Sequence, residues 1–383
     1  MFAVRFLFNG GWDLKLSKAI QRIEKRFPPN WAETGDFAGF LVGDPWADVE
    51  RVLLALDPLI TVVNEAAEKG VDLLITHHPP DIEAPERIVK GDTKTGAYFA
   101  AVKGDVAMYV IHTAWDVSTV SPSFALAAQL GLLAPEVVAP TDKGSLFKLV
   151  VFIPEEHLEK VRKAITDAGA GHIGNYSECT FSTSGEGTFK PGAGTSPYSG
   201  KVGERKLKKE SRLETIVPEE RLSAVIEAMT TAHPYEEIAY DIYAVENVPG
   251  RIGFGAVGEL PKPLSLLEMA HTLKGILPAA DLSVCGNSDI RVSRVAVIGG
   301  SGGKFIDKAL SKNADVLITG EAGYHQQRYA EARGLPLIIA GHFATEWVGL
   351  PLLKDELEKV LWDKPGEGIV EIASSEHNPM WIT

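Results

Sequence analysis

The chain is 383 residues long and 45% of its residues are hydrophobic, which is enough for two or three domains with real cores. A net charge of −13 and an isoelectric point near 5.3 argue against a general electrostatic grip on nucleic acid or on an anionic membrane. A small molecule or a metal ion is therefore the better expected ligand.

The cysteines and the N-terminal segment bear on location. Cys179 and Cys285 show no paired spacing, which predicts a reducing, cytoplasmic compartment. The first residues lack a full signal-peptide pattern, and no apolar run approaches transmembrane length. We expect no contact with a membrane.

Short β-branched runs alternate with amphipathic stretches along the chain, a pattern typical of α/β construction. Helices are expected between the strands, among them 58–70 and 303–313, which end in Gly70 and Asn313. The expected strands, in chain order, are 51–57, 72–76, 107–113, 294–299, 315–319 and 336–341.

The strands contain an internal repeat. Asp72 of "DLLIT" follows Arg51 by 21 residues, and Asp315 of "DVLIT" follows Arg294 by the same 21. After "LIT" the first half has His77-His78, whereas the second has Gly320-Glu321. Each half then has a strand that ends in a histidine with a carboxylate four residues later: His112 with Asp116, and His342 with Glu346. We predict two related α/β units that face one shared site.

A different repeat lies between these halves. Segments 149–165 and 213–229 share a strand, a Pro-Glu-Glu helix start and a helix at an offset of 64 residues. With the strand-rich segments that follow each helix, the module is predicted as β-α-β-β-α-β, a ferredoxin-like α+β domain. The predicted domains are 1–145 and 251–383, which form one discontinuous α/β domain, and an insertion at 146–250.

The histidines and carboxylates suggest a metal centre. Adjacent side chains on a strand point to opposite faces, so His77 and His78 serve one site only if the backbone leaves strand geometry, or if they bind two different ions. On a helix, His342 and Glu346 would lie on one face, four residues apart. A histidine at a strand end is usually a turn or hydrogen-bonding residue, but His77, His78, His112, His325 and His342 all lie at or beyond strand ends. Imidazole with carboxylate suits zinc, manganese or iron.

Three other segments are given simpler interpretations. The glycine-rich "IGGSGGKF" (298–305) lacks the glycine and hydroxyl positions of a phosphate-binding loop, so we predict a tight strand-to-helix turn whose amides could still meet an anion. Segment 182–206 is predicted as a solvated hairpin whose basic residues could touch a ligand. Segment 232–243 is predicted as a helix end and a strand without chemistry.

Taken together, the motifs resemble a known family. "DLLITHHP", "HTAWD", "GGSGGKF", "DVLITGEAGYH" and "GHFATE", in that order, resemble the NIF three-like family, also called GTP cyclohydrolase 1 type 2 homologues or dinuclear metal centre proteins. The inserted module resembles the PII/CutA-like insertion of the long bacterial members. The resemblance covers the chain from about residue 18, and residues 1–17 do not match.

The resemblance implies a ligand set and an assembly. The family's metal ligands fall on His77, His78, Asp116, His342 and Glu346, with Glu346 as the bridge between two divalent ions per subunit. Zinc is the first expectation, with manganese or iron as alternatives. The resemblance also implies a toroidal homohexamer.

Two functions remain open from the sequence. The first is a metal-dependent hydrolase that acts on a nucleotide or another phosphate-containing small molecule, with His112, Glu321 and His325 as candidate catalytic residues. The cyclohydrolase reaction is suggested by the family name alone. The second is a non-catalytic metal-binding protein, assembled as a ring, whose PII-like domain regulates access or senses a partner.

Overall fold

The computed structural model describes residues 14–80, 85–141, 144–173, 176–245, 252–277 and 281–380. The chain divides into two compact units. The first combines Met1–Thr141 with Ile252–Thr383, and the second is Asp142–Arg251. In the described part of the chain, no helix has both the length and the apolar character needed to cross a membrane.

The first unit contains a five-stranded sheet built mainly from the first half of the chain. All neighbouring strands are parallel except β1, which is antiparallel to β4. The strand order is β1 (Gly39–Val42), β4 (Ala107–Val110), β3 (Leu73–Thr76), β2 (Arg51–Ala55) and β15 (Ile369–Ile372). The C-terminal strand β15 therefore completes a sheet that the first half begins.

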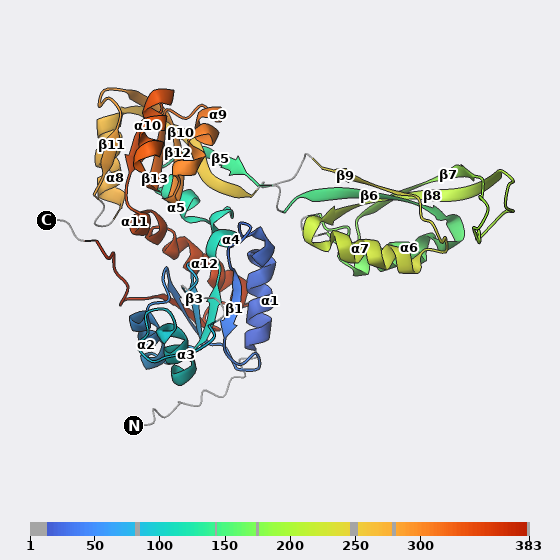
Figure 1. Cartoon of the computed structure of the whole chain (residues 1–383), viewed down its shortest axis with the longest axis horizontal. Helices are drawn as coiled ribbons and strands as arrows, with labels where there is room; N and C mark the ends of the chain where they lie inside the picture. The colour runs from blue at the N-terminus through green and yellow to red at the C-terminus, as the bar shows by residue number, and fades with distance from the viewer. Residues whose placement is uncertain are drawn as a thin grey trace. The chain divides into compact units, whose positions relative to one another are not determined.

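Helices cover both faces of this sheet (Figure 1). Val52 and Leu54 pack toward one face, with helices α1 (Leu16–Arg26) and α12 (Leu350–Leu361). Leu53 packs toward the other face, with α2 (Ile60–Glu68) and α3 (Gly96–Gly104). This alternation explains why the strands are apolar throughout, since both of their faces are buried.

A six-stranded sheet forms the rest of the first unit. Its order is β11 (Ser283–Cys285), β14 (Leu337–Ile339), β13 (Val316–Glu321), β12 (Arg291–Ser301), β10 (Gly253–Ser265) and β5 (Leu133–Pro140). The strands β12, β13 and β14 are parallel, and the other pairs are antiparallel. One face packs against α5 (Pro122–Gln129), α8 (Leu266–Ile276) and α11 (His342–Trp347), the other against α9 (Ile306–Ser311) and α10 (Tyr324–Arg333).

The repeat predicted from the sequence is present in the hydrogen bonding. The Asp72 carboxylate accepts the backbone N–H groups of Glu50 and Arg51 at 2.8 and 2.9 Å. The Asp315 carboxylate accepts those of Ser293 and Arg294, both at 2.8 Å. The six strands expected from the sequence correspond to β2, β3, β4, β12, β13 and β14, so their existence is confirmed. Strands β4 and β14 are shorter than expected: β4 ends at Val110 and β14 at Ile339, and His112 and His342 begin helices instead of ending strands.

The second unit has the element order predicted for the insertion. Its sheet order is β7 (Thr180–Phe189), β8 (Lys206–Pro218), β6 (Leu146–Pro154) and β9 (Tyr240–Ala244), with all neighbouring strands antiparallel. Helices α6 (Leu158–Asp167) and α7 (Glu219–Ala232) lie on one side of this sheet (Figure 1). Segment 182–206, predicted as a solvated hairpin, lies in the antiparallel hairpin of β7 and β8, and most of its residues are exposed, so that expectation is confirmed.

Candidate metal centre

His77 and His78 follow strand β3, and the backbone leaves strand geometry there. Their consecutive N–H groups donate to Ala55 and Leu56 carbonyls at 3.0 and 2.8 Å, whereas consecutive amides of a regular strand point in opposite directions. The Thr76 hydroxyl donates to the carbonyl of His78 at 2.8 Å. As a result the two imidazole rings lie on the same side, with centroids 4.5 Å apart.

Glu346 lies between these rings and comes from the second half of the chain. Its Oε1 is 3.5 Å from His77 Nε2, and its Oε2 is 3.3 Å from His78 Nε2. His342 begins the same helix, α11, and its Nε2 is 2.9 Å from Glu346 Oε1. The prediction that these two side chains share one helix face is therefore confirmed. Possible ligand atoms of His77, His78 and Glu346 all lie within 4.8 Å of one another.

The short helix α4 (His112–Asp116) brings two more residues to this cluster. Asp116 Oδ1 is 3.7 Å from His77 Nε2. The His112 ring lies 5.6 and 5.9 Å from the rings of His77 and His78, and its Nδ1 is 3.5 Å from Asp36 Oδ2. His112 has a φ of +29°, which marks the sharp change from strand β4 into α4.

The electrostatics of the cluster favour positive charge. Burial alone would lower the pKa of His78, but Asp57 and Glu346 outweigh it and raise that pKa to about 10. Glu346, chiefly, raises the pKa of His342 to about 9. Burial opposes ionisation of Glu346, yet His77, His342 and His78 hold its pKa well below its usual range. The carboxylates thus stabilise positive charge in the cluster, and bound divalent ions would supply that charge.

Unsatisfied polar atoms provide a direct test of whether a metal fits. Glu346 Oε2 and His77 Nδ1 are buried without a hydrogen-bond partner in the described structure, although buried polar atoms are normally paired. Glu346 is only 4% exposed. A cation beside Glu346 would satisfy that oxygen, and mixed nitrogen and oxygen donors suit zinc, manganese or iron. The donor set therefore fits a metal ion.

The glycine-rich segment 298–305 has a steric role at this site. A Cβ on Gly300 would lie 2.3 Å from Glu346 Oε1 and 3.3 Å from His342 Nε2. Gly300 also has a φ of +62°, which favours glycine. The segment is the predicted strand-to-helix turn, from β12 into the 3-10 turn Gly303–Phe305, and its glycines allow close approach to the carboxylate.

The remaining predicted catalytic residues have different surroundings. Glu321 Oε2 lies 3.3 Å from His342 Nδ1, so it borders the cluster. His325 is exposed on α10, where its ring contacts Tyr324 at 5.5 Å, and no contact with the cluster is found among the described residues.

Two carboxylates that support the histidines were missed by sequence reasoning. Asp57 Oδ1 is 2.9 Å from His78 Nδ1, and Asp36 approaches His112 while it accepts the Thr113 hydroxyl at 3.0 Å. Asp57 lies two residues after the end of strand β2, a position that could have drawn attention to it. Asp36 lies before β1 and carried no such signal.

Comparison with known proteins shows to which family the chain belongs. The family described as Duf34/NIF3 (NGG1p interacting factor 3) matches residues 14–379, nearly the whole chain. The chain belongs to the Duf34/NIF3 family. The match begins slightly before residue 18, where the sequence resemblance began.

Curated relatives and a solved structure agree with this assignment to the NIF3 family. The chain is 41% identical over 359 residues to a GTP cyclohydrolase 1 type 2 homolog from Halalkalibacterium halodurans, covering 94% of this chain and 96% of that protein. It is 42% identical over 325 residues to the protein of the same name from Bacillus subtilis, covering 85% and 87%. A NIF3-related protein from Bacillus cereus matches with a TM-score of 0.76 and 37% identity, covering 96% and 99%.

Proposed function

We propose that the chain is a dinuclear metal-dependent hydrolase that acts on a nucleotide or another phosphate-containing small molecule. The observation that carries the proposal is the position of Glu346, whose two oxygens face two different histidines. Glu346, together with His77 and His78, would hold a pair of divalent ions. The family name, GTP cyclohydrolase 1 type 2 homolog, suggests a purine nucleotide as one substrate to test.

The proposed ligands are His77, His78, Asp116, His342 and Glu346. When bound, a pair of divalent ions would supply Lewis acidity, which lowers the pKa of water and polarises a phosphoryl oxygen. The ligands come from the turn after β3, from α4 and from α11, so residues of both halves of the first unit would hold the site. Zinc is the first candidate, and metal analysis of the purified protein distinguishes it from manganese and iron.

His112 is the proposed proton-transfer residue. Its ring lies within 6 Å of both His77 and His78, and Asp36 faces its Nδ1. Burial lowers the pKa of His112, which favours the neutral imidazole that a general base requires. Glu321 is proposed to orient His342 through the 3.3 Å contact with its Nδ1. The surroundings of His325 give no support for a catalytic role.

The test compares turnover with metal content. The purified chain is screened against nucleotides and phosphoesters, and the metal ions per chain are counted. We expect a hydrolysed substrate in the wild type and loss of both metal and activity in the His77→Ala, His342→Ala double variant. Equal background rates in the two proteins would overturn the enzyme proposal.

A non-catalytic role is the second candidate. The observation in its favour is the separate unit Asp142–Arg251, which is compact in its own right. In this second candidate function, the unit acts as a PII/CutA-like sensor and the chain assembles as a homohexameric ring. Sedimentation of the full chain tests the ring, and stable metal binding without turnover on any substrate would favour this candidate.

A further inference from the structure

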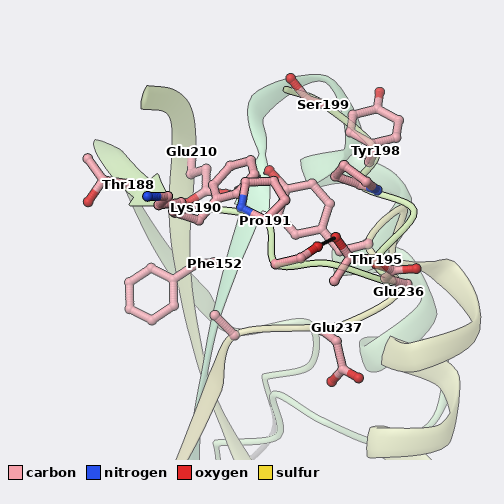
Figure 2. A pocket seen from close by; sticks show the side chains of 16 residues that line it. Phe152, Thr188, Lys190, Pro191, Thr195, Tyr198, Ser199, Glu210, Glu236 and Glu237 are labelled. Atoms are coloured by element: carbon pink, nitrogen blue, oxygen red, sulfur yellow. Dashed lines mark hydrogen bonds between the residues drawn. The ribbon is translucent and has the colours of Figure 1, made fainter. Parts of the chain in front are cut away.

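The second unit contains a pocket that the metal centre does not use. Its volume is about 430 Å³, within the range of small-molecule sites. The loop after β7 covers it, and strands β6 and β8 supply Phe152 and Glu210 (Figure 2). Pro191, also in the lining, is buried. The pocket thus combines walls from a sheet with a loop folded over them.

Three of the four aromatic rings in the lining form a contiguous cluster, and the fourth is Phe152. Tyr235 lies in the middle, 6.3 Å from Phe189 and 5.8 Å from Tyr198 between ring centroids, and both neighbours are tilted. The Tyr235 hydroxyl donates a 2.8 Å hydrogen bond to Glu210 Oε1, which fixes the ring. Burial and Glu210 raise the pKa of Tyr235, so the hydroxyl remains protonated. Such rings favour flat partners and positive charge at their faces.

The charged groups of the lining are mainly acidic. Glu210, Glu236 and Glu237 face a single basic residue, Lys190. Neither Glu237 nor Lys190 makes a hydrogen bond or ion pair with other described residues. In Figure 2 the Glu237 carboxylate lies well apart from Lys190. The lining therefore includes an unpaired carboxylate at its exposed edge, directed away from the ring cluster and separated from the ammonium.

The covering loop is poorly suited to a phosphate. Glu236 already accepts the backbone N–H of Ser196, with its two oxygens at 2.9 and 3.2 Å. An anionic ligand at this amide would have to displace that carboxylate and would face its charge. Lys208 Nζ lies 5.8 Å from the Tyr198 centroid and is paired with Glu156, so that ring face already has its own cation. The Glu236 carboxylate at the loop amide is therefore the feature that favours a cationic ligand over an anionic one.

We propose that this pocket binds a small organic cation whose positive charge adjoins a flat aromatic ring. The ring packs against Phe189, Tyr198 and Tyr235, and the charge lies toward the carboxylates. This ligand differs in charge from the phosphate-containing substrate proposed for the metal centre. The inference is independent of that proposed function, because none of the lining residues belongs to the metal cluster.

The test uses three probes that share a ring and differ in charge. Naphthylmethylammonium, naphthylmethanol and naphthylacetate are titrated into the full chain by calorimetry, with ligand-observed NMR for weak binding. The pocket signal is the binding that Phe189→Leu removes, which separates it from any binding of the acetate to the metal centre. We expect the cation to bind at least about fivefold more tightly than the alcohol, and the acetate to be the weakest.

Matched variants locate the binding. Phe189→Leu is expected to weaken the cation at least about fivefold. Phe181→Leu, on the same strand but 66% exposed and outside the lining, should leave it unchanged. Tyr198→Leu, at an exposed ring, serves as a second pocket variant if Phe189→Leu fails to fold. Glu237→Gln should weaken the cation, whereas Glu227→Gln on α7 should not.

The outcomes are decisive in either direction. Cation binding that is lost in the ring variants and kept in Phe181→Leu supports the proposal. The proposal is overturned if the cation does not bind the wild type, if the ring variants bind it as well as the wild type does, or if the acetate occupies the pocket as tightly. None of these results depends on hydrolytic activity, so failure here is distinguishable from failure of the metal-site proposal.

Discussion

The two halves of the first unit share a scaffold, but their central strands end differently. Thr76 and Thr319 occupy equivalent places, and each hydroxyl lies near the carbonyl two residues later, at 2.8 Å in the first half and 3.5 Å in the second. The next residue is His77 in one half and Gly320 in the other. A Cβ on Gly320 would lie 2.6 Å from Thr345 Oγ1 and 2.8 Å from the Cα of His342. The second half leaves this space so that its own helix α11 can reach the cluster.

The difference teaches how a repeat can form one asymmetric site. Each half has a strand followed by a helix that begins with histidine and carries a carboxylate four residues later. In the second half both side chains enter the cluster, and Glu346 lies between the rings of His77 and His78. In the first half Asp116 approaches His77 Nε2 alone among the described histidines of the cluster, at 3.7 Å. Equivalent positions therefore make unequal contributions.

The largest effect, on metal affinity, is expected from substitutions of Glu346 and Asp116, which occupy equivalent positions in the two halves. Glu346→Gln should weaken binding of both proposed ions at least about 100-fold, because it removes the charge shared by His77 and His78. Asp116→Asn should weaken one ion and leave the other. Metal ions per chain, measured by elemental analysis after dialysis, check this, with Glu331→Gln on the exposed face of α10 as the control. Equal losses in Glu346→Gln and Asp116→Asn would contradict the asymmetry.

The sequence predicts much of the scaffold, because the parallel strands are continuous apolar runs with an exact repeat in their spacing. Strands β5 and β15 were not predicted. β5 contains Pro135 and Pro140, which disfavour a strand, and its pairing with β10 joins distant segments. β15 is only four residues long, and it pairs with β2 from the opposite end of the chain.

The candidate site is predicted in part, because some of its residues follow the apolar strands that the sequence predicts. Histidines that follow apolar strands are visible in the sequence, and the spacing of His342 and Glu346 predicts a shared helix face. The carboxylate of Glu376 shows what remains hidden. It is buried and accepts the backbone N–H groups of Leu56 and Asp57 at 2.8 and 2.6 Å, although no motif surrounds it. Contacts of this kind depend on the tertiary fold alone.

The next effect concerns the space at Gly320. Gly320→Ala should destabilise the fold by about 1–3 kcal/mol, because the new methyl group meets Gly300, Thr345 and His342. Chemical denaturation measures the change, and metal binding should weaken as His342 shifts. Gly275→Ala is the control, since that helical glycine has open space around it and alanine should stabilise helix α8 slightly. Unchanged stability in Gly320→Ala would show that α11 is not held as closely as the structure indicates.

The shared part of the scaffold should respond equally in both halves. Asp72→Ala and Asp315→Ala each remove a carboxylate that accepts two backbone N–H groups at the start of a strand. We expect each to cost about 2 kcal/mol in the free energy of unfolding. Asp355→Ala, at an exposed position on α12, provides the baseline. A difference greater than the experimental error between the two variants would show that the halves are not equivalent even in their scaffold.

The smallest effect is expected at Glu65, a residue of the first half that contacts the C-terminal segment after β15. Glu65 on α2 is buried and accepts the backbone N–H groups of Ser374 and Ser375, which follow β15. Burial would raise the pKa of Glu65, but Lys69 and the two serines outweigh it and hold that pKa well below its usual range. A carboxylate with a lowered pKa stabilises the fold above the unfolded value of about 4.3, and this contribution is lost as the pH falls below it.

Glu65→Gln should therefore lower the free energy of unfolding by about 1–2 kcal/mol at neutral pH. The difference from the wild type should shrink as the pH falls below about 4, because the wild type then loses the same charge. Denaturation at several pH values measures this, with Glu68→Gln on the exposed side of the same helix as the control. A difference that stays constant with pH would mean that the hydrogen bonds, without the charge on Glu65, hold the C-terminal segment to the first half.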